Sequence, residues 1–77
     1  MPWTPEEQLA FATRLREQRR ARGLTQEALA HDAGLSVRRV ALLESGASNP
    51  RTSTLFAIAD VLGIDAADLL KAPPQGR

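Results

Sequence analysis

The sequence predicts an all-α protein that folds as a compact five-helix bundle. Apolar residues recur at helical spacing along most of the chain, and glycine or proline separates each such stretch from the next. The chain has 77 residues and no cysteine, so neither a disulfide nor a zinc–thiolate site can stabilise it. Helices held by local contacts suit so short a chain. We expect one domain over residues 1–72, followed by a flexible tail over residues 73–77.

The first helix is expected to run from Pro5 to about residue 21 or 22. Thr4 is a good N-cap, and Glu7 lies three residues after it, which is the spacing of a capping box. Phe11 and Leu15 lie one helical turn apart, so their side chains share the face that points into the bundle.

Two shorter helices follow, over about residues 26–33 and 37–45, with a tight corner between them. Gly34 lies at that corner and can adopt a positive φ without the steric cost of a Cβ atom. Thr25 and Ser36 are expected to cap the two helices. The expected core residues of these helices are Leu29, Val40 and Leu43.

The last two helices follow a loop at residues 47–51, in which proline prevents the preceding helix from continuing. One helix is expected to start at residue 52 or 53 and to end at residue 62. Its inward residues at helical spacing are Leu55, Ile58, Ala59 and Leu62. A short helix over residues 66–70 is expected to fold both Leu69 and Leu70 back onto the core.

Positive charge is concentrated in the middle of the chain. Residues 14–51 carry eight arginines against four acidic residues, whereas the whole chain has a formal net charge of only +1. A basic stripe of this kind suits the neutralisation of nucleic-acid phosphates, although arginines can also simply solvate one side of a helix. No apolar run approaches the length of a membrane span, and the N-terminus lacks the pattern of a signal peptide, so a soluble cytoplasmic protein is expected.

The stretch at residues 25–45 has the arrangement of a helix-turn-helix unit. Its second helix carries the adjacent Arg38 and Arg39 on a face that packing does not require. A helix of this kind is what a protein needs in order to read the major groove of DNA. These residues therefore predict double-stranded DNA as the partner.

Further residues place this unit in a wider pattern. They are Arg16, Arg19, GLTQEALA (23–30), AGLS (33–36), Val40, LE (43–44), Gly46, Pro50 and LFAIADVLGI (55–64). Over about residues 9–70 the chain resembles the Cro/C1-type (XRE-type) helix-turn-helix family, which includes phage repressors, controller proteins of restriction systems and some antitoxins. The resemblance implies a lambda-repressor-like fold and a homodimer that binds DNA.

By this resemblance, the helix near residues 37–45 contacts bases through Val37, Arg38, Arg39 and Leu42. An arginine can bind guanine O6 and N7 with two hydrogen bonds, which contribute about 1–3 kcal/mol of discrimination. Arg38 matches a base-reading position, whereas Arg39 either reads a base or grips a phosphate. Val37 and Leu42 stand where many relatives have polar residues, so they can only press against thymine methyl groups or exclude water. Leu42 can alternatively pack in the core or against a partner protein.

Phosphate contacts are expected at one helix N-terminus and in the loop after the recognition helix. Gln26 matches the family's phosphate-binding position at the start of its helix, where unpaired backbone N–H groups attract anions. The full set of expected phosphate contacts is Gln26, Ser36, Ser45, Asn49, Arg51 and Ser53. Arg51 can instead enter a narrowed minor groove. The alternative for Gln26 and Arg51 is a solvated polar side chain.

Arg19 and Glu44 match a charged pair that, in relatives, joins the first helix to the end of the third. We assign this pair a structural role, because breaking a buried ion pair costs about 3–5 kcal/mol. The alternative is that both side chains lie at the surface.

Enzyme chemistry has no support in the sequence. His31 is the only histidine, no cysteine accompanies it, and neither a phosphate-binding glycine loop nor a nucleophile motif is present. We therefore expect a protein that is not an enzyme, with no cofactor, no metal site and no small-molecule effector.

The leading hypothesis is a sequence-specific transcriptional regulator that binds a palindromic operator as a homodimer. The alternative is an antitoxin or a protein-interaction module for which DNA binding is secondary. Exposure of Phe56, Trp3 or Leu42 in one apolar patch would favour that alternative. Trp3 can otherwise fasten the first helix to the bundle.

Overall fold

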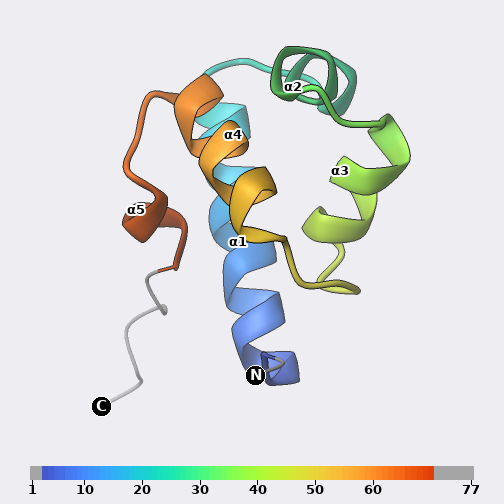
Figure 1. Cartoon of the computed structure of the whole chain (residues 1–77), viewed down its shortest axis with the longest axis vertical. Helices are drawn as coiled ribbons and strands as arrows, with labels where there is room; N and C mark the ends of the chain where they lie inside the picture. The colour runs from blue at the N-terminus through green and yellow to red at the C-terminus, as the bar shows by residue number, and fades with distance from the viewer. Residues whose placement is uncertain (1–2, 71–77) are drawn as a thin grey trace.

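Five helices, and no strand, make up residues 3–70, the part of the chain that the computed structural model describes. In chain order they are α1 (Pro5–Ala21), α2 (Gln26–Ala33), α3 (Val37–Glu44), α4 (Thr52–Leu62) and α5 (Ala66–Leu70). Figure 1 shows the long α1 with α4 in front of it, α2 and α3 on one side and α5 on the other. The predicted five-helix bundle is thereby confirmed. The expected domain end at residue 72 and the tail at 73–77 lie outside the described residues.

The helix starts follow from the polar residues that precede them. Thr4 Oγ1 accepts a hydrogen bond from the backbone N–H of Glu7 at 3.1 Å, and the Glu7 carboxylate accepts one from the backbone N–H of Thr4 at 2.8 Å. Thr25 caps α2 and Ser36 caps α3 through their hydroxyl oxygens. Each bond satisfies a backbone donor that helix geometry leaves unpaired. The N-cap of α4 is Arg51, whose side chain makes no capping hydrogen bond.

The corner between α2 and α3 depends on one glycine. Gly34 has a φ of +72°, in the left-handed region that residues with a Cβ atom avoid. The backbone N–H of Leu35 then donates to the Ala30 carbonyl at 2.8 Å, which closes the end of α2. The chain turns sharply here, so α3 packs against both α2 and α1 and keeps its opposite face at the surface.

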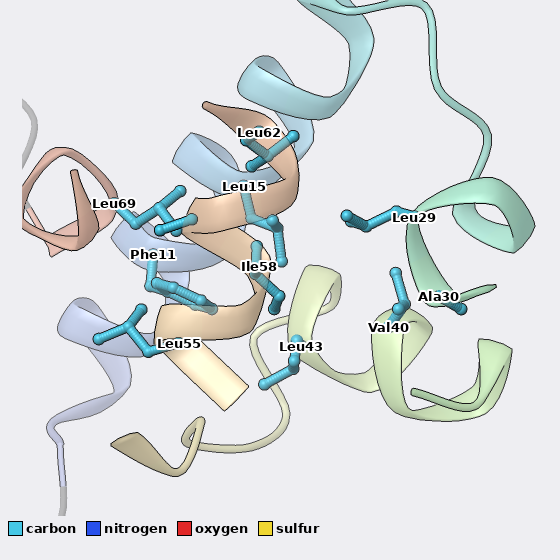
Figure 2. Packing of buried hydrophobic residues seen from close by; sticks show 11 residues of the cluster. Phe11, Leu15, Leu29, Ala30, Val40, Leu43, Leu55, Ile58, Leu62 and Leu69 are labelled. Carbon is cyan, nitrogen blue, oxygen red and sulfur yellow. The ribbon is translucent and has the colours of Figure 1, made fainter. Parts of the chain in front are cut away.

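The core is a single cluster of apolar side chains to which every helix contributes. Its largest fully buried members are Phe11 and Leu15 from α1, Leu29 from α2, Val40 and Leu43 from α3, Ile58 and Leu62 from α4, and Leu69 from α5. Figure 2 shows these side chains converging from the five helices. Replacement of one buried leucine with alanine would lower the free energy of unfolding by about 2–5 kcal/mol, because a cavity remains. This core fixes α2 and α3 relative to the rest of the bundle.

The first and last described residues pack differently against the core. Trp3 packs edge-on against Phe11, with the ring centroids 5.3 Å apart, and lies against the core cluster, so it fastens the start of α1 to the bundle. Leu69 is fully buried, but Leu70 is 49% exposed. The expectation that both leucines fold onto the core is therefore wrong for Leu70. Neighbouring side chains on a helix point about 100° apart, so this short helix turns only one of the two inward.

Candidate nucleic-acid interface

The first turn of α3 carries an arginine that is available for contacts outside the protein. Val40 and Leu43 are completely buried and fix the inner face of α3. Arg38 lies on the outer face and is exposed, and its side chain has no hydrogen-bond or ion-pair partner within residues 3–70. Val37 beside it is exposed as well. Two of the expected base-contact residues thus lie together on an accessible surface.

The other two expected base-contact residues are less accessible. Arg39 is half-buried, and its Nη2 atom donates a long hydrogen bond of 3.5 Å to the backbone carbonyl of Asn49. Leu42 is also half-buried, one turn further along α3. To reach a base, Arg39 has to leave the Asn49 carbonyl, whereas Arg38 breaks no such contact.

A buried ion pair fastens α1 to the last residue of α3. Arg19 Nε donates to Glu44 Oε2 at 2.6 Å, and Arg19 Nη2 donates to Glu44 Oε1 at 3.0 Å. Only 11% of the Arg19 side chain and 2% of the Glu44 side chain are exposed, so the pair does not lie at the surface. The hydrogen bonds to Glu44 raise the pKa of Arg19 above its ordinary value, against the opposing effect of burial. The guanidinium therefore keeps its charge inside the protein.

Further hydrogen bonds spread from this pair to neighbouring elements. Arg19 Nη1 donates to the Leu24 carbonyl at 2.7 Å, just before α2. Arg16 Nη1 donates to the backbone carbonyl of Glu44 at 2.7 Å. Gln26, the first residue of α2, donates from Nε2 to Glu44 Oε1 at 3.1 Å. These five residues, which we call the Glu44 cluster, join the start of α2 and the end of α3 to α1.

The serine and arginine candidates for phosphate contacts differ in what their side chains already bind. Ser36 Oγ accepts the capping hydrogen bond of α3 at 3.0 Å, so its own hydroxyl hydrogen is still available. The Ser45 hydroxyl already donates to a backbone carbonyl one turn earlier, at 2.8 Å. The side chains of Arg51 and Ser53 are exposed and make no hydrogen bond in the described part of the chain. Ser36, Arg51 and Ser53 are therefore better placed to contact a phosphate than Ser45.

The loop between α3 and α4 is held by a contact that the sequence did not predict. Asn49 Oδ1 accepts a hydrogen bond from Gln8 Nε2 at 2.7 Å, although the two residues are 41 positions apart. The amide oxygen of Asn49 is thus in use, and its NH2 group is the part that can contact a phosphate. Gln8 was not predicted, and Arg16 was named only as part of the family pattern, because each acts through a partner on another element. Both lie one helical turn from the buried Ala12, and for Gln8 this spacing was the only signal in the sequence.

Apart from Val37, the large exposed apolar side chains among residues 3–70 lie outside α2 and α3. Phe56 on α4 is 60% exposed. A groove of about 460 Å³ is lined by residues that include Trp3, Leu55 and Leu70, and none of its lining residues belongs to α2 or α3. Of the three residues that were to form one exposed patch, only Phe56 is exposed, since Trp3 and Leu42 are half-buried on different elements. The three side chains therefore do not form one exposed patch, although Phe56 is exposed by itself.

Neither a metal site nor a membrane span is found in the region that the structure describes. No group of three His, Cys, Asp or Glu residues within positions 3–70 is placed to hold a metal ion. No helix in that range is long and apolar enough to cross a lipid bilayer. The polar side chains that do meet within this region are those of the Glu44 cluster, on α1, α2 and α3.

Known proteins share the helix-turn-helix unit and much of the surrounding bundle. A family model described as helix-turn-helix, HTH_3, matches residues 15–69. The HTH-type transcriptional regulator DdrOP3 of Deinococcus deserti is 43% identical over 63 residues, which are 82% of this chain and 49% of that protein. The chain thus spans about half the length of this relative.

Similar solved structures include proteins of different function. The restriction-modification controller protein C.AhdI from Aeromonas hydrophila is 37% identical, with a TM-score of 0.79 over 80% of this chain and 94% of that chain. The hydroxypropylphosphonic acid epoxidase from S. wedmorenis is 31% identical, with a TM-score of 0.80 over 95% of this chain but only 38% of that chain. A shared fold alone does not decide function, so the residues on α2 and α3 have to carry that argument. The chain belongs to the HTH_3 helix-turn-helix family, the predicted Cro/C1 type, as a DNA-binding domain of the kind found in transcriptional regulators.

Proposed function

We propose that this chain is the DNA-binding domain of a sequence-specific transcriptional regulator. It acts in the cytoplasm, by binding rather than by catalysis, as a homodimer on a palindromic duplex with α3 of each copy in the major groove. The observation that carries the proposal is Arg38. Its guanidinium is exposed and unpartnered within positions 3–70, on the first turn of a helix whose inner face is completely buried.

Arg38 has both the chemistry and the support that base reading requires. Its guanidinium offers five N–H donors in a fixed fork, and two of them match guanine O6 and N7. The buried Val40 and Leu43 hold α3, so a helix rather than a mobile loop sets the position of this fork. We expect the contact to contribute about 1–3 kcal/mol of discrimination against other bases. Val37, exposed beside it, suits the methyl group of a neighbouring thymine.

Phosphate contacts on both sides of α3 orient it in the groove. Gln26 is the first residue of α2, where unpaired backbone N–H groups favour an anion. Arg51 and Ser53 lie at the other side, around the start of α4, with exposed side chains. Contacts of this type fix the register of the protein on the duplex without reading its sequence. The remaining residues of the proposed interface are Ser36, Arg39, Leu42, Ser45 and Asn49.

Selection of bound sequences from a random duplex pool tests base reading. We expect the wild-type protein to enrich a palindrome with a guanine in each half-site, and Arg38→Ala to relax the preference at one base pair per half-site. Arg20→Ala is the matched control, because Arg20 is an exposed arginine on α1, and it should leave the selected sequence unchanged. If Arg38→Ala instead weakens binding equally on all sequences, Arg38 does not read a base.

Two further measurements test DNA binding itself and the dimer. The affinity for random duplex should fall steeply with salt, because phosphate contacts release counterions from the DNA. Absence of binding at low salt would exclude the proposed function. Sedimentation of the complex on a selected site should give two chains per duplex. The selected palindrome should place its two half-sites about 34 Å apart. One chain per selected site would contradict the homodimer.

A protein-interaction module or an antitoxin is the alternative function, and the structure supports it less. Exposure of Phe56, Trp3 or Leu42 in one apolar patch would favour this alternative. Phe56 is the only one of these three that is exposed. The unpartnered Arg38 has no role in that alternative, whereas base reading uses it directly. The salt titration on random duplex separates the two functions.

A further inference from the structure

Glu44 contacts a residue of the proposed DNA interface as well as its ion-pair partner. Its Oε1 atom accepts hydrogen bonds from Arg19 Nη2 at 3.0 Å and from Gln26 Nε2 at 3.1 Å. Its Oε2 atom accepts one from Arg19 Nε at 2.6 Å. Because an ionised carboxylate only accepts hydrogen bonds, it can hold the Gln26 amide only through the NH2 group of that amide. The Glu44 carboxylate therefore fixes the orientation of the Gln26 amide, with the NH2 group rather than the oxygen toward Glu44 Oε1.

The amide held in this way keeps one donor in reserve. An NH2 group has two hydrogens, and Glu44 takes one hydrogen of Gln26. Among residues 3–70, no other acceptor takes the second. That hydrogen lies at the first residue of α2, beside first-turn backbone N–H groups of which the Thr25 cap uses only one. A phosphate oxygen is bound by donors of this kind.

The ion pair allows a carboxylate to lie this close to a polyanion. An uncompensated Glu44 would repel a phosphate at the start of α2, but Arg19 balances its charge with two hydrogen bonds. Arg19 is held in turn by the Leu24 carbonyl at 2.7 Å, in the segment that leads into α2. Glu44 is almost completely buried, so water does not compete with Gln26 for its oxygen. The Glu44 cluster thus combines a neutralised charge with a fixed amide.

We propose that Glu44 is a positioning residue for phosphate binding. It orients the Gln26 amide so that an N–H group faces the DNA backbone before the DNA arrives. This inference rests on the proposed function, in which Gln26 contacts a phosphate. A side chain that is already ordered loses less conformational entropy on binding than one that rotates freely, so the oriented amide binds more tightly.

Nitrogen relaxation of the side-chain NH2 groups in the DNA-free wild-type protein tests the orientation. Gln26 and Gln8 each donate a hydrogen bond to another element, so both amides should be ordered. Gln18 is the internal control, because its amide accepts a surface hydrogen bond from Arg22 and donates none within the described range, and it should be more mobile. A Gln26 amide as mobile as that of Gln18 would overturn the proposal, and this experiment needs no variant.

Duplex affinities in a double-mutant cycle test the consequence for binding. Gln26→Ala should weaken binding about tenfold on every sequence, because a hydrogen bond to a charged phosphate is lost. Glu44→Gln should weaken binding about threefold in the wild-type background and not at all in the Gln26→Ala background, because the two residues are coupled. An equal loss in both backgrounds would overturn the proposal. Gln18→Ala is the matched control and should leave the duplex affinity unchanged in both backgrounds.

Failure of this inference and failure of the proposed function give different results. Circular dichroism tests whether each variant is folded at the temperature of the assay. If Glu44→Gln is unfolded, the relaxation data on the wild-type protein decide whether the Gln26 amide is oriented. Wild-type protein that binds no duplex at low salt would remove the proposed function, and the phosphate role of Gln26 with it. Wild-type protein that binds duplex, together with an additive cycle, would remove only the role of Glu44.

Discussion

Arg19 and Arg38 are the same residue type in opposite surroundings. Arg19 is buried, and all three nitrogens of its guanidinium donate to Glu44 or to the Leu24 carbonyl. The Arg38 side chain is exposed and makes no hydrogen bond or ion pair inside the described range. Partners and burial, rather than residue type, thus assign one basic side chain to folding and the other to binding. Changes near Arg19 should alter the free energy of unfolding, and changes at Arg38 the free energy of binding.

The largest expected effect comes from breaking the buried pair. Glu44→Ala leaves the Arg19 guanidinium buried without its partner, so the free energy of unfolding in a urea titration should fall by about 3–5 kcal/mol. Glu17→Ala is the control, because Glu17 lies 3.9 Å from Arg14 in a surface pair and 61% of its side chain is exposed. This control should change the free energy of unfolding by less than about 1 kcal/mol. Similar losses of unfolding free energy in both variants would mean that burial does not make the Arg19–Glu44 pair more important for stability than the surface pair.

The next largest effect is expected at Arg38, in binding alone. Arg38→Lys keeps the charge but loses the two-pronged geometry, so discrimination for guanine should fall by about 1–3 kcal/mol. Competition binding with duplexes altered at one base pair measures this loss. The free energy of unfolding should stay within about 0.5 kcal/mol of the wild-type value, because the side chain is exposed. A marked loss of stability would show that Arg38, like Arg19, contributes to folding, and would contradict the assignment of Arg38 to binding alone.

The corner glycine tests whether a change in the scaffold reaches base reading. No atom lies within 4 Å of a Cβ atom added at Gly34, so Gly34→Ala should lower the free energy of unfolding by about 1–2 kcal/mol through backbone strain alone. Gly46→Ala should lower it by a similar amount, because the Leu9 Cδ2 atom that its Cβ would meet at 2.9 Å belongs to an exposed side chain that can turn away. Urea titration measures both losses. The preferred DNA sequence should not change in either variant, and a changed preference would show that strain at the corner reorients α3.

The smallest effect is expected at Arg39, which lies between the two extremes. Its long hydrogen bond to the Asn49 carbonyl is weak, so Arg39→Ala should lower the free energy of unfolding by less than about 1 kcal/mol. The loss of base discrimination should be smaller than for Arg38→Lys, because Arg39 has to break that contact before it reaches a base. The same urea titration and competition binding measure both quantities. Greater discrimination at Arg39 than at Arg38 would reverse their order as base readers.

The fold could be predicted wherever the signal is local. Thr4 and Glu7 act on each other within one turn of α1, and Gly34 closes α2 through its own φ, so their spacing in the sequence marks the helix ends. The choice between Leu69 and Leu70 is different, because it depends on where a five-residue helix docks on the bundle. Spacing alone does not contain that information, and the prediction for Leu70 was wrong.

The candidate site could be predicted only in part. The outward position of Arg38 follows from the helical period of α3, because Val40 and Leu43 define the opposite face. The Arg19–Glu44 pair was expected from the family resemblance and not from any local pattern. The contacts from Gln26 to Glu44 and from Gln8 to Asn49 join residues 18 and 41 positions apart. Only the packing of α1 and α2 against α3 and its following loop brings such side chains together. No local sequence pattern therefore predicts these contacts.

The edge-on contact between Trp3 and Phe11 supplies a built-in optical reporter. Trp3 is the only tryptophan in the chain, and it packs against a core residue beside a groove that α2 and α3 do not line. Its emission should therefore change when the core opens and respond little when a duplex docks on α3. Tryptophan emission then follows unfolding while the anisotropy of a labelled duplex follows binding. The two fluorescence signals, measured on one sample, can thus show whether a substitution changes the folding equilibrium or the binding equilibrium.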